Sequence, residues 1–320
     1  MRKGTAMNHD VFWLPASNHC SLHVYQWLPA APIRAVVLLA HGMAEHAGRY
    51  QRLGQALSAA GFALYAHDQR GHGRTAEHGT LGLFASHQGW DSVVNDLASL
   101  AQHIGQQYPG APLFLFGHSM GSYIVQAYLL HHSASLQGAV LSGSNFQPPA
   151  LYRAACVIAR LEAWRQGPLG RSALIDWLSF GSFNKAFKPN RTAFDWLSRD
   201  SAEVDAYVAD PLCGFRCTNR LWVDLLMGLE HISQPRHLAQ IDPNLPILVM
   251  GGECDPVSAG KRLKDLVGAL RLAGNQRVQL QLYPQARHEL LNETNRDEVT
   301  AALIAWLEQA LTQGRPARSE

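Results

Sequence analysis

The chain has 320 residues, of which 47% are hydrophobic and 16% are charged, a composition typical of folded globular proteins. Its 27 Lys and Arg residues nearly balance 25 Asp and Glu residues, so the charge does not favour nucleic acid as a partner. No apolar stretch approaches the ~18 residues of a membrane span, and the one near the start is too short for a secretory signal. The five cysteines are odd in number and widely spaced, so we expect reduced thiols and a cytoplasmic protein.

Alternating strands and helices dominate the chain after an opening antiparallel pair of strands, expected at 11–15 and 22–28. The strands expected next are 35–40, 62–67, 112–116, 138–142, 246–250 and 278–283, and the expected helices are 49–60, 90–107, 120–132, 257–272 and 297–312. Strongly apolar strands that alternate with helices are typical of parallel sheets. We therefore predict an α/β fold with a mostly parallel, eight-stranded sheet flanked by helices on both faces.

One interval, 145–235, interrupts this alternation. It contains no convincing apolar strand, but it has several helical patterns and half of the eight tryptophans. We predict that it forms a helical cap over the carboxyl edge of the sheet, where ligands bind in open α/β folds. The alternative is a packing layer remote from the site. Residues 1–144 and 236–313 would then form the two parts of the core, followed by a disordered tail at 314–320.

The sequence GHSMG at 117–121 lies between an expected buried strand and a helical pattern that begins at Met120. A serine at such a strand-to-helix turn is held in a strained conformation that exposes its hydroxyl, while the flanking glycines let neighbouring backbone pass closely. Ser119 is therefore the candidate nucleophile. Because Gly-x-Ser-x-Gly also occurs by chance, this interpretation depends on an acid and a histidine elsewhere in the chain.

A neutral serine needs a base that takes its proton and an acid that orients the base. Asp255 follows the expected strand 246–250, and His288 follows the expected strand 278–283. Because the carboxyl ends of parallel strands meet at one edge of the sheet, both residues are expected near Ser119. The three residues are thus the candidate catalytic triad.

Each member of this triad has a competitor. Glu253 could be the acid, but Pro256 would begin the next helix and leave Asp255 at the loop tip, so we favour Asp255. His118 is next to Ser119, but adjacent residues on a turn diverge. We therefore expect His118 to point away from the position of the base and to pack against the turn.

The negative oxygen of an acyl-transfer intermediate needs preorganised N–H donors, each worth on the order of 3 kcal/mol in the transition state. One donor is expected from Met120, the residue after the nucleophile, at the start of a helix whose dipole favours negative charge. The second is expected from Met43, in the loop after the strand 35–40. The backbone amides of these two residues are the candidate oxyanion hole.

Two pairs of residues could bind metal. Cys213 and Cys217 lie four residues apart, but no histidine ligand lies near them in the sequence. His41 and His46 also lack an accompanying ligand pattern. We therefore predict no metal and no cofactor.

The chain resembles the monoacylglycerol lipase and lysophospholipase branch of the α/β-hydrolases, a branch also grouped with the S33 serine aminopeptidases. The motifs that carry the resemblance are HGMAEHAGRY at 41–50, HDQRGHGR at 67–74, GHSMG at 117–121, and Asp255 with His288. The resemblance covers about 35–310. It implies an α/β-hydrolase fold in which Ser119 is the nucleophile, His288 the base and Asp255 its orienter, and the amides of Met43 and Met120 form the oxyanion hole.

The expected function is hydrolysis of acyl esters of glycerol or related lipids through an acyl-enzyme. The expected partner is a small acyl ester, with at most peripheral membrane contact through the cap, and the oligomeric state is left open. A serine aminopeptidase is the alternative, and it would need acidic residues for the substrate's α-amino group. The candidates in the cap are Glu162, Asp176, Asp195, Asp200, Glu203, Asp205 and Asp210. A non-catalytic binding protein is disfavoured because the triad is complete.

The composition of the cap favours an apolar acyl chain. Apolar residues recur at helical spacing in its first part, and three phenylalanines cluster further on. We expect these apolar faces to receive the acyl chain, although some of them must hold the cap on the core. The residues concerned are Leu151, Ala155, Ile158, Leu161, Phe180, Phe183 and Phe187.

Overall fold

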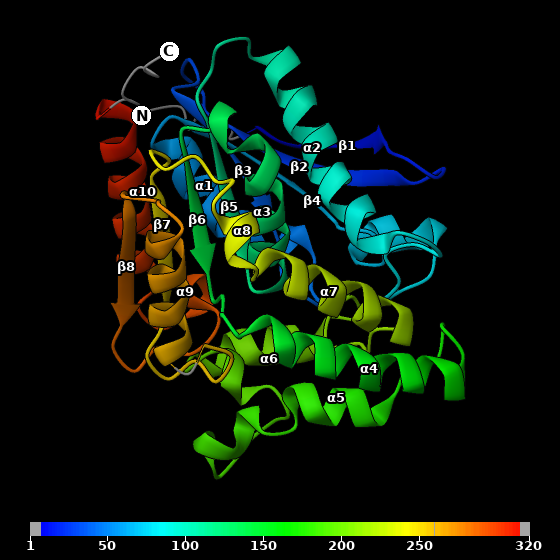
Figure 1. The fold of residues 1–320 in the computed structure, drawn as a ribbon. Coiled ribbons are helices and arrows are strands. Elements are labelled where there is room, and N and C mark those ends of the chain that lie inside the picture. The colour runs from blue at the N-terminus through cyan, green and yellow to red at the C-terminus, as the bar shows by residue number, and fades with distance from the viewer. Residues whose placement is uncertain (1–7, 259, 314–320) are drawn as a thin grey trace.

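The computed structural model describes residues 8–258 and 260–313, and the predicted disordered tail, 314–320, lies outside them. An eight-stranded sheet forms the centre of this part of the chain, in the order β1-β2-β4-β3-β5-β6-β7-β8 (Figure 1). The β1–β2 and β2–β4 pairs are antiparallel and the other five pairs are parallel, so the predicted mostly parallel, eight-stranded sheet is confirmed. The strands are β1 (Asn8–Pro15), β2 (Ser21–Leu28), β3 (Ala35–Ala40), β4 (Phe62–His67), β5 (Leu113–His118), β6 (Gly138–Ser142), β7 (Ile247–Gly252) and β8 (Val278–Tyr283).

Helices cover both faces of the sheet. On one face, α1 (Gln51–Ala59) and α10 (Arg296–Thr312) pack through leucines, valines and Trp306. On the other face lie α2 (Gly89–Gln107), α3 (Met120–His132) and α9 (Lys261–Leu272). The inner strands β3, β4, β6 and β7 are buried along their whole length because they are covered on both sides.

Helix α9 begins at Lys261, four residues later than the sequence pattern predicts. The reason lies in the preceding loop, where the Asp255 side chain accepts a hydrogen bond from the Val257 N–H. Gly260 then turns the chain with a φ of 60°. Residues 255–258 and Gly260 therefore belong to the loop that holds Asp255.

The segment between β6 and β7 is helical, as predicted. It contains α4 (Pro149–Gln166), α5 (Ala173–Phe180), α6 (Ser201–Ala209), α7 (Asn219–Ile232) and α8 (Pro235–Leu238), with two 3₁₀ turns, η4 (Phe183–Phe187) and η5 (Asp195–Leu197), between α5 and α6. Helices α4, α5 and α6 form a layer beyond the carboxyl ends of the strands, and α7 packs against α4 on one side and against α2 and α3 on the other (Figure 1). The boundaries of the predicted cap, 145–235, stay a prediction.

The side of α4 that is buried differs from the predicted one. Leu151, Ile158 and Leu161 are 53%, 39% and 59% exposed, whereas the buried face of α4 includes Cys156 and Ala159. These smaller side chains let α4 approach α7 closely, since the Cys156 thiol reaches the Val223 carbonyl at 4.0 Å. The expectation that Leu151, Ile158 and Leu161 line an acyl pocket is therefore wrong.

Within the described residues, the helices are all too short or too polar to cross a membrane.

Candidate active site

Ser119 forms the turn between β5 and α3 with φ 50° and ψ −119°, a conformation that residues with a side chain rarely adopt. The Ser119 N–H donates to the Ser142 carbonyl at 2.9 Å, and the Ser119 carbonyl accepts from both the N–H and the hydroxyl of Ser122. Gly121 lies so close to β3 that a Cβ there would be 2.0 Å from the Ala40 carbonyl oxygen. The turn therefore depends on glycine beside the serine, as the GHSMG motif predicts.

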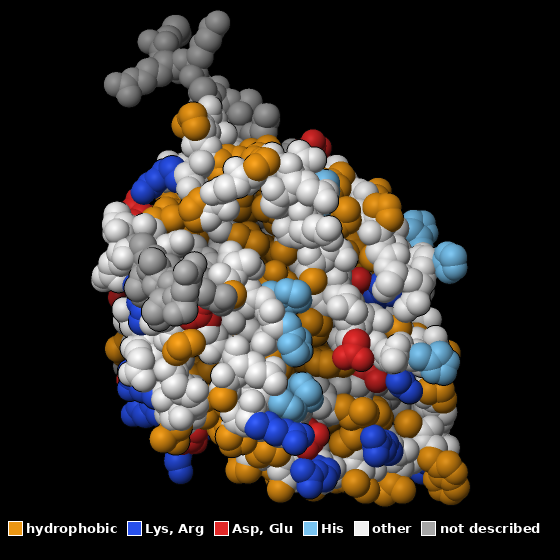
Figure 2. Space-filling view, turned by 45° about the horizontal axis from the view of Figure 1, so that its top comes forward, with side chains coloured by type: hydrophobic (Ala, Val, Ile, Leu, Met, Phe, Trp, Pro, Cys, Tyr) orange, Lys and Arg blue, Asp and Glu red, His pale blue; other side chains and the backbone are white. Residues whose placement is uncertain are grey.

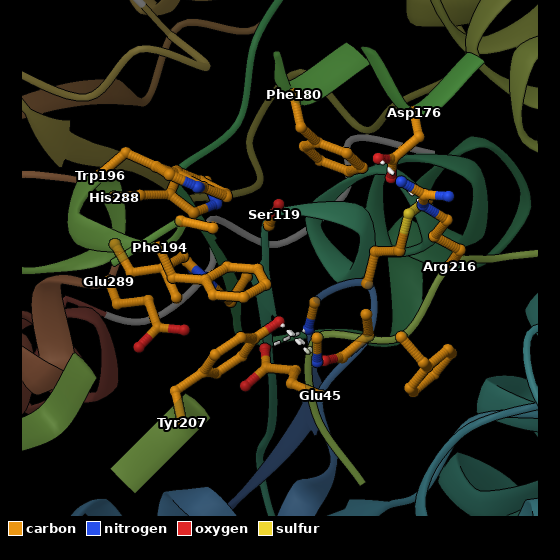
Figure 3. A pocket seen from close by; sticks show the side chains of 18 of the residues that line it. Glu45, Ser119, Asp176, Phe180, Phe194, Trp196, Tyr207, Arg216, His288 and Glu289 are labelled. Carbon is orange, nitrogen blue, oxygen red and sulfur yellow. Dashed lines mark hydrogen bonds and ion pairs between the residues drawn. The ribbon is translucent and has the colours of Figure 1, made fainter. Parts of the chain in front are cut away.

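Asp255 and His288 lie together at the carboxyl ends of β7 and β8. His288 Nδ1 is 3.0 Å from Asp255 Oδ1, and both residues are buried. His288 and Ser119 line the same pocket (Figure 3). Glu253, the competing acid, is exposed to solvent. The fold therefore gathers Ser119, Asp255 and His288 at one edge of the sheet. In the chain, Asp255 lies 136 residues after Ser119, and His288 lies 33 residues after Asp255.

The pKa of His288 lies above its usual value, although burial by itself lowers it. The Asp255 carboxylate raises the pKa most, and the Glu289 and Glu45 carboxylates add to this effect. A nearby negative charge favours the imidazolium that forms when a histidine accepts a proton. The surroundings of His288 thus suit a general base.

His118 lies against His288 rather than away from it, so the expected orientation is wrong. Its ring centroid is 4.8 Å from that of His288, and its side chain lines the pocket. Burial first, and then the charge of His288, lower the pKa of His118 to about 4. Both rings converge on Gly143, where an added Cβ would be 3.0 Å from His288 and 3.1 Å from His118. His118 is therefore a neutral neighbour of the candidate base.

The two candidate oxyanion donors approach the pocket from different elements. Met120 is the first residue of α3, so its N–H has no carbonyl partner one turn earlier in the helix. Met43 lines the pocket in the loop after β3. The preceding N–H, that of Gly42, is already engaged because it donates to Glu45 Oε1 at 2.5 Å. This contact favours Met43 over Gly42 as the second donor.

A buried network, which the sequence analysis missed, connects this loop to the histidine loop. The Arg49 guanidinium donates to Glu45 at 2.7 Å and to both carboxylate oxygens of Glu289 at 2.7 Å. Arg49 also lies over the Tyr207 ring at 4.8 Å, and the Tyr207 hydroxyl donates to the Ala44 carbonyl. The motif HGMAEHAGRY contains Glu45 and Arg49 but gives no sign of Glu289, which lies 240 residues further along the chain.

The histidine loop is also attached to η5. The Glu289 N–H donates to the Leu197 carbonyl at 2.8 Å, and the Arg287 guanidinium donates to the carbonyls of Asp195 and Ser198. The Trp196 ring lies 5.1 Å from the ring of His288. One part of the helical segment is therefore bonded directly to the loop that carries the candidate base.

The pocket around Ser119 has a volume of about 370 Å³. Phe180 and Trp196 lie on one side of Ser119, and Tyr207 and Glu45 lie on the opposite side (Figure 3). An exposed ion pair between Asp176 and Arg216, with 3.3 Å between the closest atoms, stands at the rim near Phe180. Apart from this charged pair at the rim, the side with Phe180 and Trp196 is apolar and the side with Tyr207 and Glu45 is polar, with the serine between them.

Of the seven acidic residues considered for an aminopeptidase, all within the described chain, only Asp176 lines this pocket. The other six are bonded to cations or to N–H and O–H donors, three within the helical segment and three in the core. The pairs are Glu162 with Arg165, Asp195 with Thr192, Asp200 with Arg296, Glu203 with Arg52, Asp205 with Arg191, and Asp210 with His46.

Comparison with known proteins identifies the family. The sequence pattern of a family described as serine aminopeptidase, S33 (Hydrolase_4), matches residues 31–295. The chain belongs to this family. The resemblance inferred from the motifs is thus confirmed.

Relatives in this S33 family include ester hydrolases. The chain is 30% identical to a monoacylglycerol lipase of Mycolicibacterium smegmatis, over 88% of this chain and 90% of the relative, and 28% identical to the monoglyceride lipase of Homo sapiens, over 90% and 85%. Its fold matches that of a carboxyl esterase from Bacillus coagulans, solved in complex with glycerol, with a TM-score of 0.88, 26% identity and coverage of 96% of this chain and 100% of the esterase. These relatives support the predicted class, a serine ester hydrolase of the monoacylglycerol lipase and esterase type.

Proposed function

We propose that this protein hydrolyses medium-chain acyl esters of glycerol or a related alcohol, with Ser119 as nucleophile, His288 as general base and Asp255 as the residue that orients His288. The observation that carries the proposal is the pocket, which Ser119 and His288 share between an apolar and a polar end. The ester hydrolases among the relatives support the same reaction class.

In the proposed reaction the Ser119 oxygen attacks the ester carbonyl while its proton passes to His288. The N–H groups of Met43 and Met120 donate to the negative oxygen of the tetrahedral intermediate. When the ester C–O bond breaks, His288 returns the proton to the departing alcohol, and Ser119 keeps the acyl group. A water molecule then attacks the acyl-enzyme, again through His288, and releases the carboxylic acid.

The two ends of the pocket suit the two halves of such an ester. The acyl chain would lie along Phe180 and Trp196, where apolar burial favours it by ~0.8 kcal/mol per methylene. The alcohol would lie toward Tyr207, Glu45 and Glu289, which offer oxygen acceptors for hydroxyl groups. A volume of about 370 Å³ is near the lower end of the ~300–1,000 Å³ range of ligand pockets, which favours a medium rather than a long acyl chain.

Aminopeptidase activity is the second candidate, because the family description includes it. An α-amino group would need carboxylates that are free to pair with it. Glu45 and Glu289 face the pocket, but Arg49 already bonds both of them, and Asp176 pairs with Arg216. Because these carboxylates are already paired, we favour an ester over a peptide as the substrate.

We also propose peripheral membrane contact through α4 and α5, the helices farthest from the sheet. Their outer face carries large apolar side chains, and hydrophobic side chains gather along the lower edge of the molecule in Figure 2, where this layer lies. Such a surface could rest on a bilayer while lipid enters the pocket. The exposed residues are Leu151, Val157, Ile158, Leu161, Trp164, Leu174, Trp177 and Leu178.

The test of the substrate class is kcat/KM across p-nitrophenyl esters from acetate to decanoate, with alanine p-nitroanilide alongside. We expect kcat/KM to rise by up to ~4-fold per methylene until the apolar end is filled, because each buried CH₂ contributes ~0.8 kcal/mol. It should fall again for the longest chain, and the anilide should be a poor substrate. A steady decrease from acetate onward, or a preference for the anilide, would contradict the proposal.

A further inference from the structure

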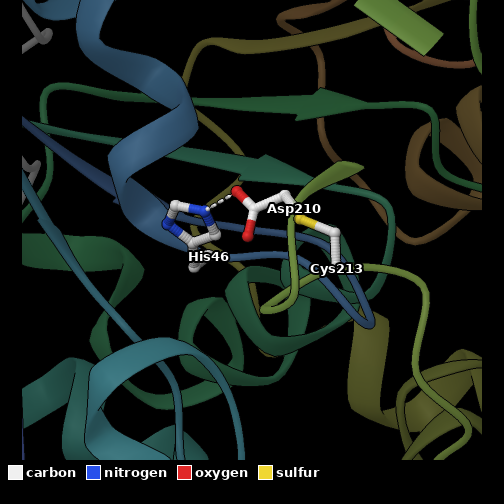
Figure 4. Close-up of side chains that lie close together, drawn as sticks. All are labelled: His46, Asp210 and Cys213. Carbon is white, nitrogen blue, oxygen red and sulfur yellow. Dashed lines mark hydrogen bonds and ion pairs between the residues drawn. The ribbon is translucent and has the colours of Figure 1, made fainter. Parts of the chain in front are cut away.

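Three potential metal ligands meet beside the active-site loop, and one of them, His46, lies 164 residues before Asp210 in the sequence. His46, Asp210 and Cys213 each offer one ligand atom, and these three atoms lie within 4.8 Å of one another (Figure 4). His46 Nε2 is 2.9 Å from Asp210 Oδ2. In the sequence, His46 was paired only with His41 and Cys213 only with Cys217, whereas the fold brings His46 to Asp210 and Cys213.

The His46 ring makes few hydrogen bonds besides the one to Asp210. Its only hydrogen bond among the described residues is the one to Asp210, because the buried Nδ1 atom has no partner there. A cation shared by His46 and Asp210 would therefore replace one hydrogen bond and break no other. Cys213 is a free, partly buried thiol in a loop without helix or strand.

The surrounding charge favours a cation. The Cys213 thiol interacts electrostatically with one cation, Arg49, and with three carboxylates, those of Glu45, Asp210 and Glu289. The local charge is therefore negative before the thiol ionises.

We propose that His46, Asp210 and Cys213 form a site for a thiophilic divalent cation of the zinc class, with water as the fourth ligand. Nitrogen, carboxylate and thiolate together are the donors that Zn²⁺ prefers over Mg²⁺ or Ca²⁺. Tetrahedral bonds of ~2.0–2.3 Å place ligand atoms roughly 3.3–3.8 Å apart. The His46–Asp210 pair, now 2.9 Å apart, would open slightly to reach this spacing.

The proposed cation site lies between two loops that border the pocket. His46 lies three residues after Met43, whereas Asp210 and Cys213 belong to the loop after α6. These two loops already touch, because the Ala44 carbonyl accepts from Gly214 N–H at 2.9 Å. A bound cation would link them more firmly and fix the loop that carries a candidate oxyanion donor. This inference does not depend on the proposed ester substrate.

The test is a titration of chelator-treated protein with Cd²⁺, followed by the ultraviolet charge-transfer band of a cadmium–thiolate bond. A Cys254→Ser background removes the exposed thiol. We expect a band that saturates at one Cd²⁺ per chain and is lost in Cys213→Ser. His46→Asn and Asp210→Asn should each weaken binding by more than ~10-fold. The matched control, Cys217→Ser, should keep the band, because that buried thiol lies outside the cluster.

A second measurement uses Zn²⁺ and thermal unfolding. A cation that binds only the folded chain raises Tm, so Zn²⁺ should raise the Tm of the background protein and of Cys217→Ser but not that of Cys213→Ser or His46→Asn. Absence of the cadmium band, or a band that persists unchanged in Cys213→Ser, would overturn the proposal. An equal Tm increase in all variants would do the same.

Discussion

At the scale of single residues, Ser119 combines a position in the pocket with an unfavourable backbone conformation. A side-chain-bearing residue at φ 50° and ψ −119° costs on the order of 1–3 kcal/mol, and the hydrogen bonds to Ser142 and Ser122 hold it there. Strain of this kind persists only where the surrounding structure imposes it. In this chain the turn directs the serine side chain into the pocket.

This strain predicts opposite effects of one substitution on stability and activity. Ser119→Gly should raise the free energy of unfolding by about 1 kcal/mol. Glycine relieves the backbone strain of the folded state, and this gain exceeds the ~0.5–1 kcal/mol by which the greater conformational entropy of glycine stabilises the unfolded chain. The same variant should have no esterase activity, because the nucleophilic oxygen is gone. Urea denaturation beside an activity assay checks both, with Ser99→Gly in α2 as the control at an ordinary, exposed helical position. A less stable Ser119→Gly variant would contradict the strain argument.

The charge around His288 predicts a shift in the pH profile. The base must be neutral to accept a proton, so the rate falls as pH decreases through the pKa of His288, which lies above its usual value. Glu289→Gln removes one of the carboxylates that raise this pKa, so the acidic limb of kcat/KM should move to lower pH. The exposed Glu253→Gln should leave the profile unchanged. A shift to higher pH in Glu289→Gln would refute this reading of the electrostatics.

The sequence predicts single residues well where local pattern decides their position. Ser119, Asp255 and His288 each follow an apolar strand, and the structure places all three at the carboxyl edge of the sheet. His118 was misplaced because the direction of a side chain at a strained turn depends on backbone angles that no residue pattern reveals. The pairing of Arg49 with Glu289 was missed because it joins residues 240 positions apart.

At the scale of elements, the loops at the carboxyl edge are tied to specific parts of the helical segment. The carbonyls of η5 bond the histidine loop, and the loop after α6 bonds the loop after β3 through Ala44. Helix α4 contacts neither loop with a hydrogen bond among the described residues, and it packs on α7 instead. We therefore assign the positioning of the active-site loops to η5 and α6, and the outer surface of the layer to α4 and α5.

The exposed face of α4 predicts where the protein meets lipid. Replacing Leu161 and Trp164, 59% and 86% exposed, with aspartate should weaken binding to phosphatidylcholine vesicles several-fold while leaving hydrolysis of soluble esters nearly intact. Leu272→Asp is the matched control, because this leucine is 92% exposed at the end of α9, remote from α4. Vesicle co-sedimentation measures the difference. Equal binding by the α4 variant and the wild type would rule out this surface.

Element boundaries were predictable because apolar periodicity and turn residues set them locally. Helix α3 and the strands β3, β4, β6 and β8 match the expected ranges to the residue. The face of α4 was not predictable, because its large apolar side chains follow helical spacing on a side that the fold exposes. Only the close packing of Cys156 and Ala159 on α7, a tertiary contact, decides which side is buried.

At the scale of the whole molecule, the sheet gathers residues from distant parts of the chain at one edge, and the helical segment closes over that edge (Figure 1). The candidate catalytic residues in the pocket thus belong to the core, whereas most of the apolar wall of the pocket belongs to the segment between β6 and β7. This division explains why the reaction class was easier to predict than the substrate. The candidate chemistry follows the geometry of the strand ends, whereas the pocket shape follows the packing of η5 and α5.

The most direct test of the central claim is the release of glycerol from 1-monooctanoylglycerol, measured as kcat/KM for the wild type and for Ser119→Ala. We expect the wild type to hydrolyse this ester and the variant to lose at least ~10³-fold while unfolding at a similar temperature. The loss would place the chemistry on the Ser119 hydroxyl. Comparable turnover by a folded Ser119→Ala variant, or no turnover by the wild type, would contradict the account.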